Sequence, residues 1–166
     1  MWPFTSERKE ALKQFSRFVA PDVIEEILAH PEEEYPKPRS MFIGFMVIQV
    51  IDDDTERLNQ LVPQIIEVIQ QHQSTMNGIT ISLITAMFGA PVPTQANPSQ
   101  TCQAVAQQLV QSFPHEVKVA YGSGTALIGS WGRADYFCYG PMFPSFSRHL
   151  EKLCSLNYGD CAEINW

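Results

Sequence analysis

Three consecutive aspartates and one late arginine are the residues of this chain whose types could serve a chemical reaction. Asp52, Asp53 and Asp54 could bind a divalent cation, since hard cations such as Mg²⁺ take carboxylate ligands. Arg148 could hold an anion. Adjacent residues of an extended chain point to opposite faces, so three successive carboxylates cannot all converge on one ion. The competing interpretation is structural: an aspartate caps the helix that follows, and the arginine forms a salt bridge.

The histidines and cysteines, which are the other common metal-binding types, are scattered along the chain. None of the four histidines has a partner at ligand spacing, and the four cysteines show no close metal-ligand pattern. Cys102, Cys138 and Cys154 fall on apolar patterns, which predicts small buried side chains with free thiols in a reducing cytosol. We therefore expect no bound metal and no cofactor.

Hydrophobic patterns predict the elements that would position these residues. Residues 41–51 are apolar on both faces, which is typical of a buried central strand. A helix should follow from about Asp54 to Gln73, and Pro63 should either kink it or mark its true start. Residues 78–87 predict a hairpin or a pair of strands.

The second half of the chain predicts two more helices and two more strands. A helix should start at Asn97-Pro98, and the last long helix should open at Pro141, since proline is tolerated at the first helical position. Two strands are expected on either side of a turn at Ser123-Gly124. The resulting order β-α-β-β-α-β-β-α is an α+β arrangement with a ferredoxin-like centre, in which helices cover one face of a mostly antiparallel sheet.

The first 38 residues differ in character from the rest. Residues 5–19 and 21–28 predict two short amphipathic helices, and residues 30–38 contain three prolines and a charge run that suit a linker. We therefore expect a helical lead-in with a Pro/Glu-rich linker over residues 1–38 and one folded domain over residues 39–166.

Several segments share their spacing with a known family. The run from Val117 to Gly132 holds two apolar stretches around Ser-Gly and ends in Gly-Ser-Trp-Gly. Asp135-Tyr-Phe-Cys-Tyr-Gly140 follows it, and Ala86-Met-Phe-Gly-Ala-Pro91 precedes it. In this spacing the chain resembles the catalytic domain of the class III adenylate and guanylate cyclases, and residues 15–28 are similar to the lead-in of many bacterial members. The resemblance implies the nucleotide-cyclase fold, with active sites formed between two domains arranged head to tail.

The resemblance also implies that most of the family's chemistry is missing from this chain. Val47 and Ser82 fall where the two metal-binding aspartates belong, and Gly78 falls near the base-reading lysine. Phe137 occupies the position of the Thr or Asp that reads the base together with this lysine. Pro144 replaces the asparagine that orients the ribose. Arg148 alone is retained, and without metals one arginine leaves most transition-state stabilisation missing. We therefore predict a catalytically inactive cyclase-like domain, with Arg148 and Phe137 as remnants of a ligand site.

A loss of polar catalytic groups from a retained scaffold favours a role in binding. Apolar residues in or beside the former cleft predict a contact surface for a second copy of the chain or for another protein; these residues are Val47, Met142, Phe143 and Trp131. A regulatory partner or an immunity-type protein that neutralises a toxin would fit this role. Two alternatives remain. One is a sensor that binds a nucleotide or another small ligand without turnover, and the other is an unorthodox cyclase that uses the aspartates with Arg148.

Composition narrows the remaining classes. The 166 residues are 45% hydrophobic and 17% charged, which suits one globular domain. The net charge of −7 and the pI near 5.0 argue against nucleic-acid binding, which depends on Lys and Arg. No run approaches the roughly 18 apolar residues of a membrane span, and the polar residues 6–10 interrupt any signal peptide. We expect a cytoplasmic protein.

Overall fold

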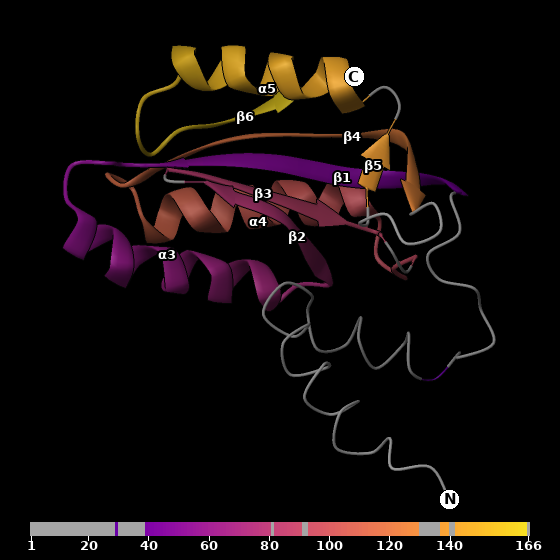
Figure 1. The fold of residues 1–166 in the computed structure, drawn as a ribbon, viewed down its shortest axis with the longest axis horizontal. Helices are drawn as coiled ribbons and strands as arrows, with labels where there is room; N and C mark the ends of the chain where they lie inside the picture. Colours follow the sequence, from indigo (N-terminus) through magenta and orange to yellow (C-terminus); the bar gives the residue numbers. More distant parts are fainter. Residues whose placement is uncertain are drawn as a thin grey trace, which may run out of the picture.

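The computed structural model describes residues 29, 39–80, 82–90, 93–129, 137–139 and 142–165. They form a six-stranded sheet of order β2-β3-β1-β4-β5, in which β6 also pairs with β4 (Figure 1). Every pairing is antiparallel except that of β4 with β6. The elements are β1 Arg39–Val50, α3 Thr55–Gln70, β2 Ser74–Thr80, β3 Leu83–Phe88, α4 Pro98–Ser112, β4 Val117–Gly129, β5 Phe137–Tyr139, α5 Met142–Ser155 and β6 Cys161–Ile164.

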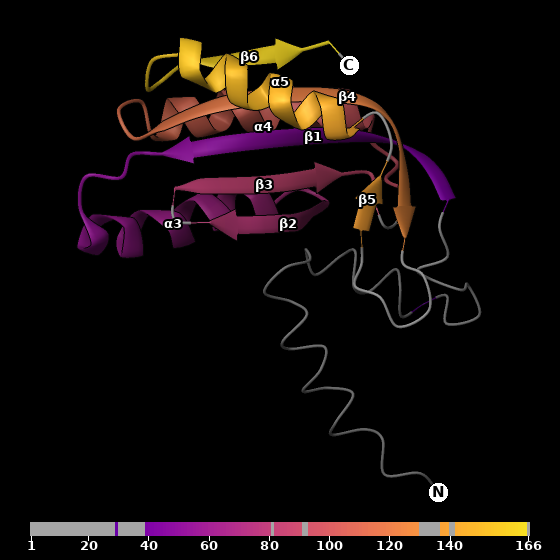
Figure 2. The ribbon, with the colours of Figure 1, turned by 45° about the horizontal axis from the view of Figure 1, so that its top comes forward.

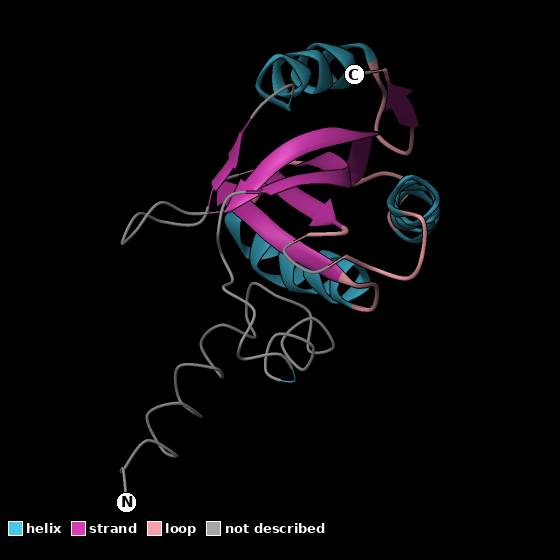
Figure 3. Ribbon diagram, turned by 90° about the vertical axis from the view of Figure 1, so that its right-hand side faces the viewer, coloured by secondary structure: helices cyan, strands magenta, loops and turns pink. Residues whose placement is uncertain are grey.

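Strand β1 lies at the centre of the sheet and is buried on both faces. Side chains alternate along a strand, so its residues divide into two sets, each in a different core cluster: Met46, Ile48 and Val50 in one, and Ile43, Phe45 and Val47 in the other. The first cluster contains residues of α3 and α4, and the second contains Leu153 of α5 (Figures 2 and 3). Helices therefore cover both faces, and the expectation that they cover one face is wrong, because a strand apolar on both sides needs cover on both.

The starts of α3 and α4 follow from their capping residues. The Asp54 side chain accepts a hydrogen bond of 3.0 Å from the Glu56 amide, and the Asn97 side chain accepts one of 2.9 Å from the Ser99 amide. Each bond satisfies an amide that the first helical turn leaves unpaired. Helix α3 thus begins at Thr55, and Pro63 lies inside the helix and does not mark its start.

Helix α4 packs close to the sheet because glycine stands beneath it. A side-chain carbon placed on Gly44 would come within 2.5 Å of the Pro98 carbonyl oxygen and 2.9 Å of the Cys102 Cβ. Gly89 has a φ of +86°, a conformation that only glycine adopts readily, and it also faces Pro98. These two glycines set the position of α4 over β1.

The turn expected at Ser123-Gly124 does not form. Strand β4 is continuous from Val117 to Gly129 and pairs with β1 from Val50↔Val117 to Arg39↔Ile128, so Ser123 lies opposite Gly44 in mid-strand. The full-length partner strand supplies paired backbone along this whole segment, which outweighs the local preference of glycine for turns. The hairpin instead joins β4 to β5, where Leu127 pairs with Tyr139.

Other expectations about the chain are met. Strands β2 and β3 form the hairpin predicted around residues 78–87. The predicted order ends at the last helix, and β6 is a further strand after it. The helices predicted for residues 5–19 and 21–28 lie outside the described residues. Among the helices that the structure describes, none combines the length and apolar character needed to cross a membrane.

Candidate functional site

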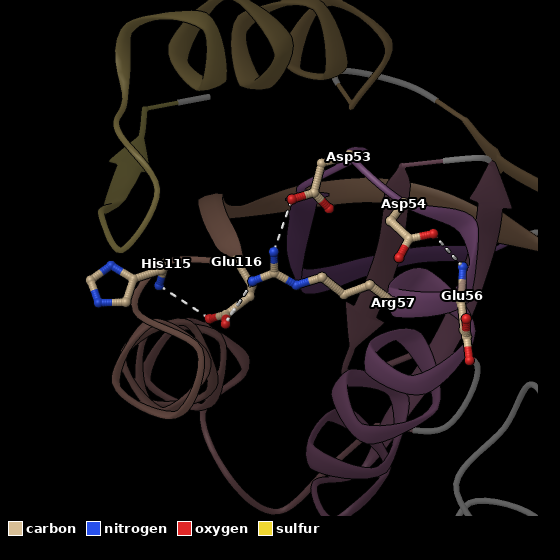
Figure 4. A network of polar contacts seen from close by, with 6 residues as sticks. All are labelled: Asp53, Asp54, Glu56, Arg57, His115 and Glu116. Carbon is tan, nitrogen blue, oxygen red and sulfur yellow. Dashed lines mark hydrogen bonds and ion pairs between the residues drawn. The ribbon is translucent and has the colours of Figure 1, made fainter.

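The three aspartates follow β1 and lead into α3. Asp53 and Asp54 bind different partners (Figure 4). Asp54 is the helix cap described above. Asp53 accepts a hydrogen bond of 2.9 Å from the Arg57 guanidinium, one helical turn later. Asp52 is exposed. The capping interpretation is confirmed for Asp54.

Arg57 links the end of β1 to the start of β4. Its Nη1 binds Asp53 Oδ2, and its Nη2 binds Glu116 Oε1 at 3.1 Å. The Glu116 carboxylate also accepts a hydrogen bond of 3.2 Å from the His115 amide. The side chains of Arg57 and Asp53 are 42% and 46% exposed, so each ion pair contributes at most about 1 kcal/mol. In this arrangement the carboxylates of Asp53 and Glu116 bind a cationic side chain, which lowers their value as metal ligands.

We also searched the described residues for other groups of metal-binding side chains. In the described part of the chain, no three residues of the types His, Cys, Asp and Glu lie close enough to hold a metal ion. Hard cations need several convergent oxygen ligands, so these residues offer no such site.

The structure separates the two positions that the family resemblance assigns to metal-binding aspartates. Val47 pairs with Thr85 on one side and Ala120 on the other, and it is fully buried in the cluster beneath α5. Ser82 lies at the β2–β3 turn, where its carbonyl accepts a hydrogen bond of 2.8 Å from the Val50 amide. Val47 is three residues before Val50, which is about 10 Å along a strand. The β1 residue beside Ser82 is therefore Val50, which is also fully buried and apolar.

Arg148 lies on α5, away from the aspartates. Its Nη1 donates a hydrogen bond of 3.2 Å to the carbonyl of Asn165, which follows β6. The two sites lie at different positions along β4. The end of β6, beside Arg148, lies at Gly122, where Ile164 pairs. Glu116, the partner of Arg57, directly precedes the first residue of β4. Six residues of strand span roughly 20 Å. The structure therefore does not bring Arg148 together with the Asp53 carboxylate. Arg148 donates to a backbone carbonyl, and the salt bridge expected for it stays a prediction.

The side chains of Phe137, Trp131, Met142 and Phe143 lie outside the described residues. The backbone places Phe137 opposite Gly129 on β5, and Met142 at the first position of α5. Val47, the remaining member of the predicted contact surface, is fully buried in the isolated chain. Val47 therefore cannot contact a partner directly, and it could contribute to such a surface only by packing beneath the exposed residues.

The sequence interpretation missed His149 on the buried side of α5. His149 is fully buried, and its ring lies edge-on to Phe45 with centroids 5.3 Å apart. Its spacing of three from Phe146 and four from Leu153 is the helical signal that could have placed it on this face. Phe146 contacts the same Phe45 ring at 6.4 Å.

The thiols vary in exposure. Cys102 is fully buried, with its Sγ 3.5 Å from the Phe45 carbonyl oxygen, and burial raises the pKa of this thiol. Burial also raises the pKa of Cys161, with a smaller contribution from the negative charge of Asp160. A raised pKa leaves little reactive thiolate at neutral pH. Cys154 is exposed, contrary to the expectation, because it follows the inward-facing Leu153 and turns away from the sheet.

No family model and no curated protein matches the sequence. Solved structures do match it. The catalytic core of a rhodopsin-guanylyl cyclase with converted specificity, in complex with ATPalphaS, superposes with a TM-score of 0.63 at 10% identity over 77% of this chain and 80% of that chain. The monomeric guanylyl cyclase domain of the RhoGC fusion protein from the aquatic fungus Blastocladiella emersonii gives 0.62 at 10% identity over 76% and 82%. The adenylyl cyclase CyaB from P. aeruginosa gives 0.54 at 12% identity over 76% and 78%.

These matches confirm the expected fold. The chain has the α+β fold of the nucleotide cyclase catalytic domain, with a mostly antiparallel six-stranded sheet.

Proposed function

We propose that this chain, which has the fold of a nucleotide cyclase catalytic domain, is catalytically inactive and acts by binding another protein chain. The observation that carries the proposal is the apolar character of β1. Both candidate positions for its metal-binding residue, Val47 and Val50, are valines buried in the core. A valine offers no ligand atom, and a cation at either position would have to enter the packed interior.

The neighbouring polar groups do not replace the missing ligands. Ser82 offers one neutral hydroxyl, and its main-chain carbonyl is bonded to Val50. The carboxylates of Asp53 and Glu116 are paired with Arg57. The reaction of a nucleotide cyclase acts on a nucleoside triphosphate. Such phosphoryl chemistry depends on metals that bridge phosphate oxygens and neutralise developing charge. Arg148 alone would supply only a small part of that stabilisation.

The binding role rests on the residues around the start of α5. Met142 and Phe143 open this helix, and Trp131 lies in the segment between β4 and β5. We assign these residues to a protein contact surface, because apolar residue types in place of polar catalytic groups would lower the desolvation cost of burying this part of the chain. In this role the chain would regulate its partner, or it would be an immunity-type protein that neutralises a toxin.

Calorimetry with Mn²⁺ or Mg²⁺ tests the proposed loss of the metal site. The full chain should show no binding tighter than about millimolar, because too few oxygen ligands converge. A micromolar site that disappears in Asp52→Ala but persists in Asp160→Ala would contradict the proposal, since it would show that the first aspartate has taken over metal binding.

A further inference from the structure

The start of β1 is covered on only one of its two faces. Met41 belongs to the buried cluster that contains Leu153 of α5, whereas Phe42, which points to the opposite face, is 50% exposed. On that second face the cover ends where the first turn of α4 packs over Gly44. Strand β3 also ends there, since Phe88 pairs with Gly44 (Figure 2). In the described part of the chain, this end of the sheet therefore has one uncovered face.

The uncovered face has an apolar centre. Phe42 pairs with Thr125, and Ser40 pairs with Leu127, both on the neighbouring strand β4. Ser40 and Thr125 are exposed, and Leu127 is half-buried. We call these four residues the Phe42 patch. None of the four is charged, so an apolar segment could be buried against them without removing one of their charges from water.

The chain supplies an apolar segment shortly before β1. Residues 21–28 predict an amphipathic helix with Val23, Ile24, Ile27 and Leu28 on one side. Ala29, which follows them, is the only residue before position 39 that the structure describes, and it is helical. Isolated helices shorter than about 12 residues are marginal in water. The predicted helix therefore needs an apolar surface to pack on.

The linker is long enough to bring this helix to the Phe42 patch. Residues 30–38 join Ala29 to Arg39, and a linker of this length spans at most about 30 Å when it is extended. Phe42 follows Arg39 at a distance of about 10 Å along the strand. A short linker also holds the helix near the patch at an effective concentration of about millimolar. A separate protein would have to compete with that concentration.

We propose that residues 21–28 pack as a helix on the Phe42 patch of the same chain. Their apolar side covers Phe42, and the acidic residues Asp22, Glu25 and Glu26 lie on the opposite side of the helix in water. The docked helix supplies the cover that α4 gives farther along β1. Its release exposes an apolar surface, so the lead-in acts as a strap on the folded domain. This inference goes beyond the proposed function and does not depend on the missing metal site.

Hydrogen exchange of the full chain, measured by mass spectrometry, tests the proposal. The amides of residues 21–28 should exchange at least about tenfold more slowly than in a synthetic peptide of the same residues. Phe42→Ser should remove this protection, because the helix loses its anchor. Ile79→Ser is the matched control, because Ile79 is a 47% exposed apolar residue on the edge strand β2, and it should leave the protection unchanged.

The amides of β1 and α4 show in the same experiment whether each variant is folded. Thr125→Glu, which places a charge beside Phe42 at an exposed position, should also remove the protection and serves if Phe42→Ser unfolds. Wild-type residues 21–28 that exchange as fast as the peptide overturn the inference. Protection that survives in the folded patch variants, or that is lost equally in Ile79→Ser, overturns it too. So does protection that disappears on about tenfold dilution, because the helix would then pack on another chain.

Discussion

The amide of Val50 donates a hydrogen bond of 2.8 Å to the carbonyl of Ser82, which fastens the end of β1 to the tip of the β2–β3 hairpin. In the family resemblance Ser82 stands at one metal-binding position. The bond therefore identifies Val50 as its neighbour on β1, whereas the motif spacing indicates Val47. Both valines are fully buried. The loss of a carboxylate from β1 thus does not depend on which alignment is used.

The role of the aspartates can be tested through stability. Asp54→Ala should lower the free energy of unfolding by about 1 kcal/mol, because the Glu56 amide loses its capping acceptor. Asp52→Ala should change it by less than about 0.5 kcal/mol, because Asp52 is exposed. Urea denaturation of both variants checks the contrast. Equal losses in the two variants would contradict the assignment of Asp54 as the cap.

The contact between Gly44 and α4 predicts a larger effect. Gly44→Ala should destabilise the chain by about 2 to 3 kcal/mol, because the new methyl group would press against the Pro98 carbonyl and Cys102. Gly78→Ala is the control, since its methyl group would meet only the Thr85 hydroxyl at 3.3 Å on an exposed strand. Similar melting temperatures for the two variants would show that α4 can shift away from β1 without cost.

The buried Cys102 thiol predicts a dependence of stability on pH. Its folded pKa is raised above the ordinary value of 9.0, mainly by burial. Above that pH the unfolded chain releases this proton while the folded chain keeps it, so the free energy of unfolding falls as the pH rises. Between about pH 8 and pH 10, the wild type should lose more stability than Cys102→Ala, by up to about 1.4 kcal/mol per pH unit. If the urea midpoints of the two proteins shift by the same amount between these pH values, the Cys102 thiol is not the cause of the pH dependence.

The sequence predicts the sheet and its helices where one signal dominates. The uninterrupted apolar run of β1 predicts a central strand, and Asp54 and Asn97 predict helix starts that their side chains indeed cap. The turn expected at Ser123-Gly124 is wrong because a local glycine signal competes with twelve paired positions on β1, and those pairings are long-range. A sequence pattern of a few residues carries no information about these long-range pairings.

The candidate site was harder to predict than the fold. The pattern of residues 78–87 predicts the hairpin that contains Ser82, but it cannot fix which β1 residue lies beside Ser82. That relation depends on the antiparallel register, in which Val47 pairs with Thr85. The ion pair of Arg57 with Glu116 was also missed, because the two residues are 59 positions apart in the sequence.

Cyclic-nucleotide formation tests the central claim most directly. The purified full chain should be incubated with ATP or GTP and Mn²⁺ beside an active cyclase as the positive control, and with Arg148→Ala as the matched variant. We predict no cyclic nucleotide above a protein-free blank for either form, because β1 supplies no metal ligand from Val47 or Val50. Robust turnover by the wild type that is lost in Arg148→Ala would contradict the account and show that this chain is an active enzyme.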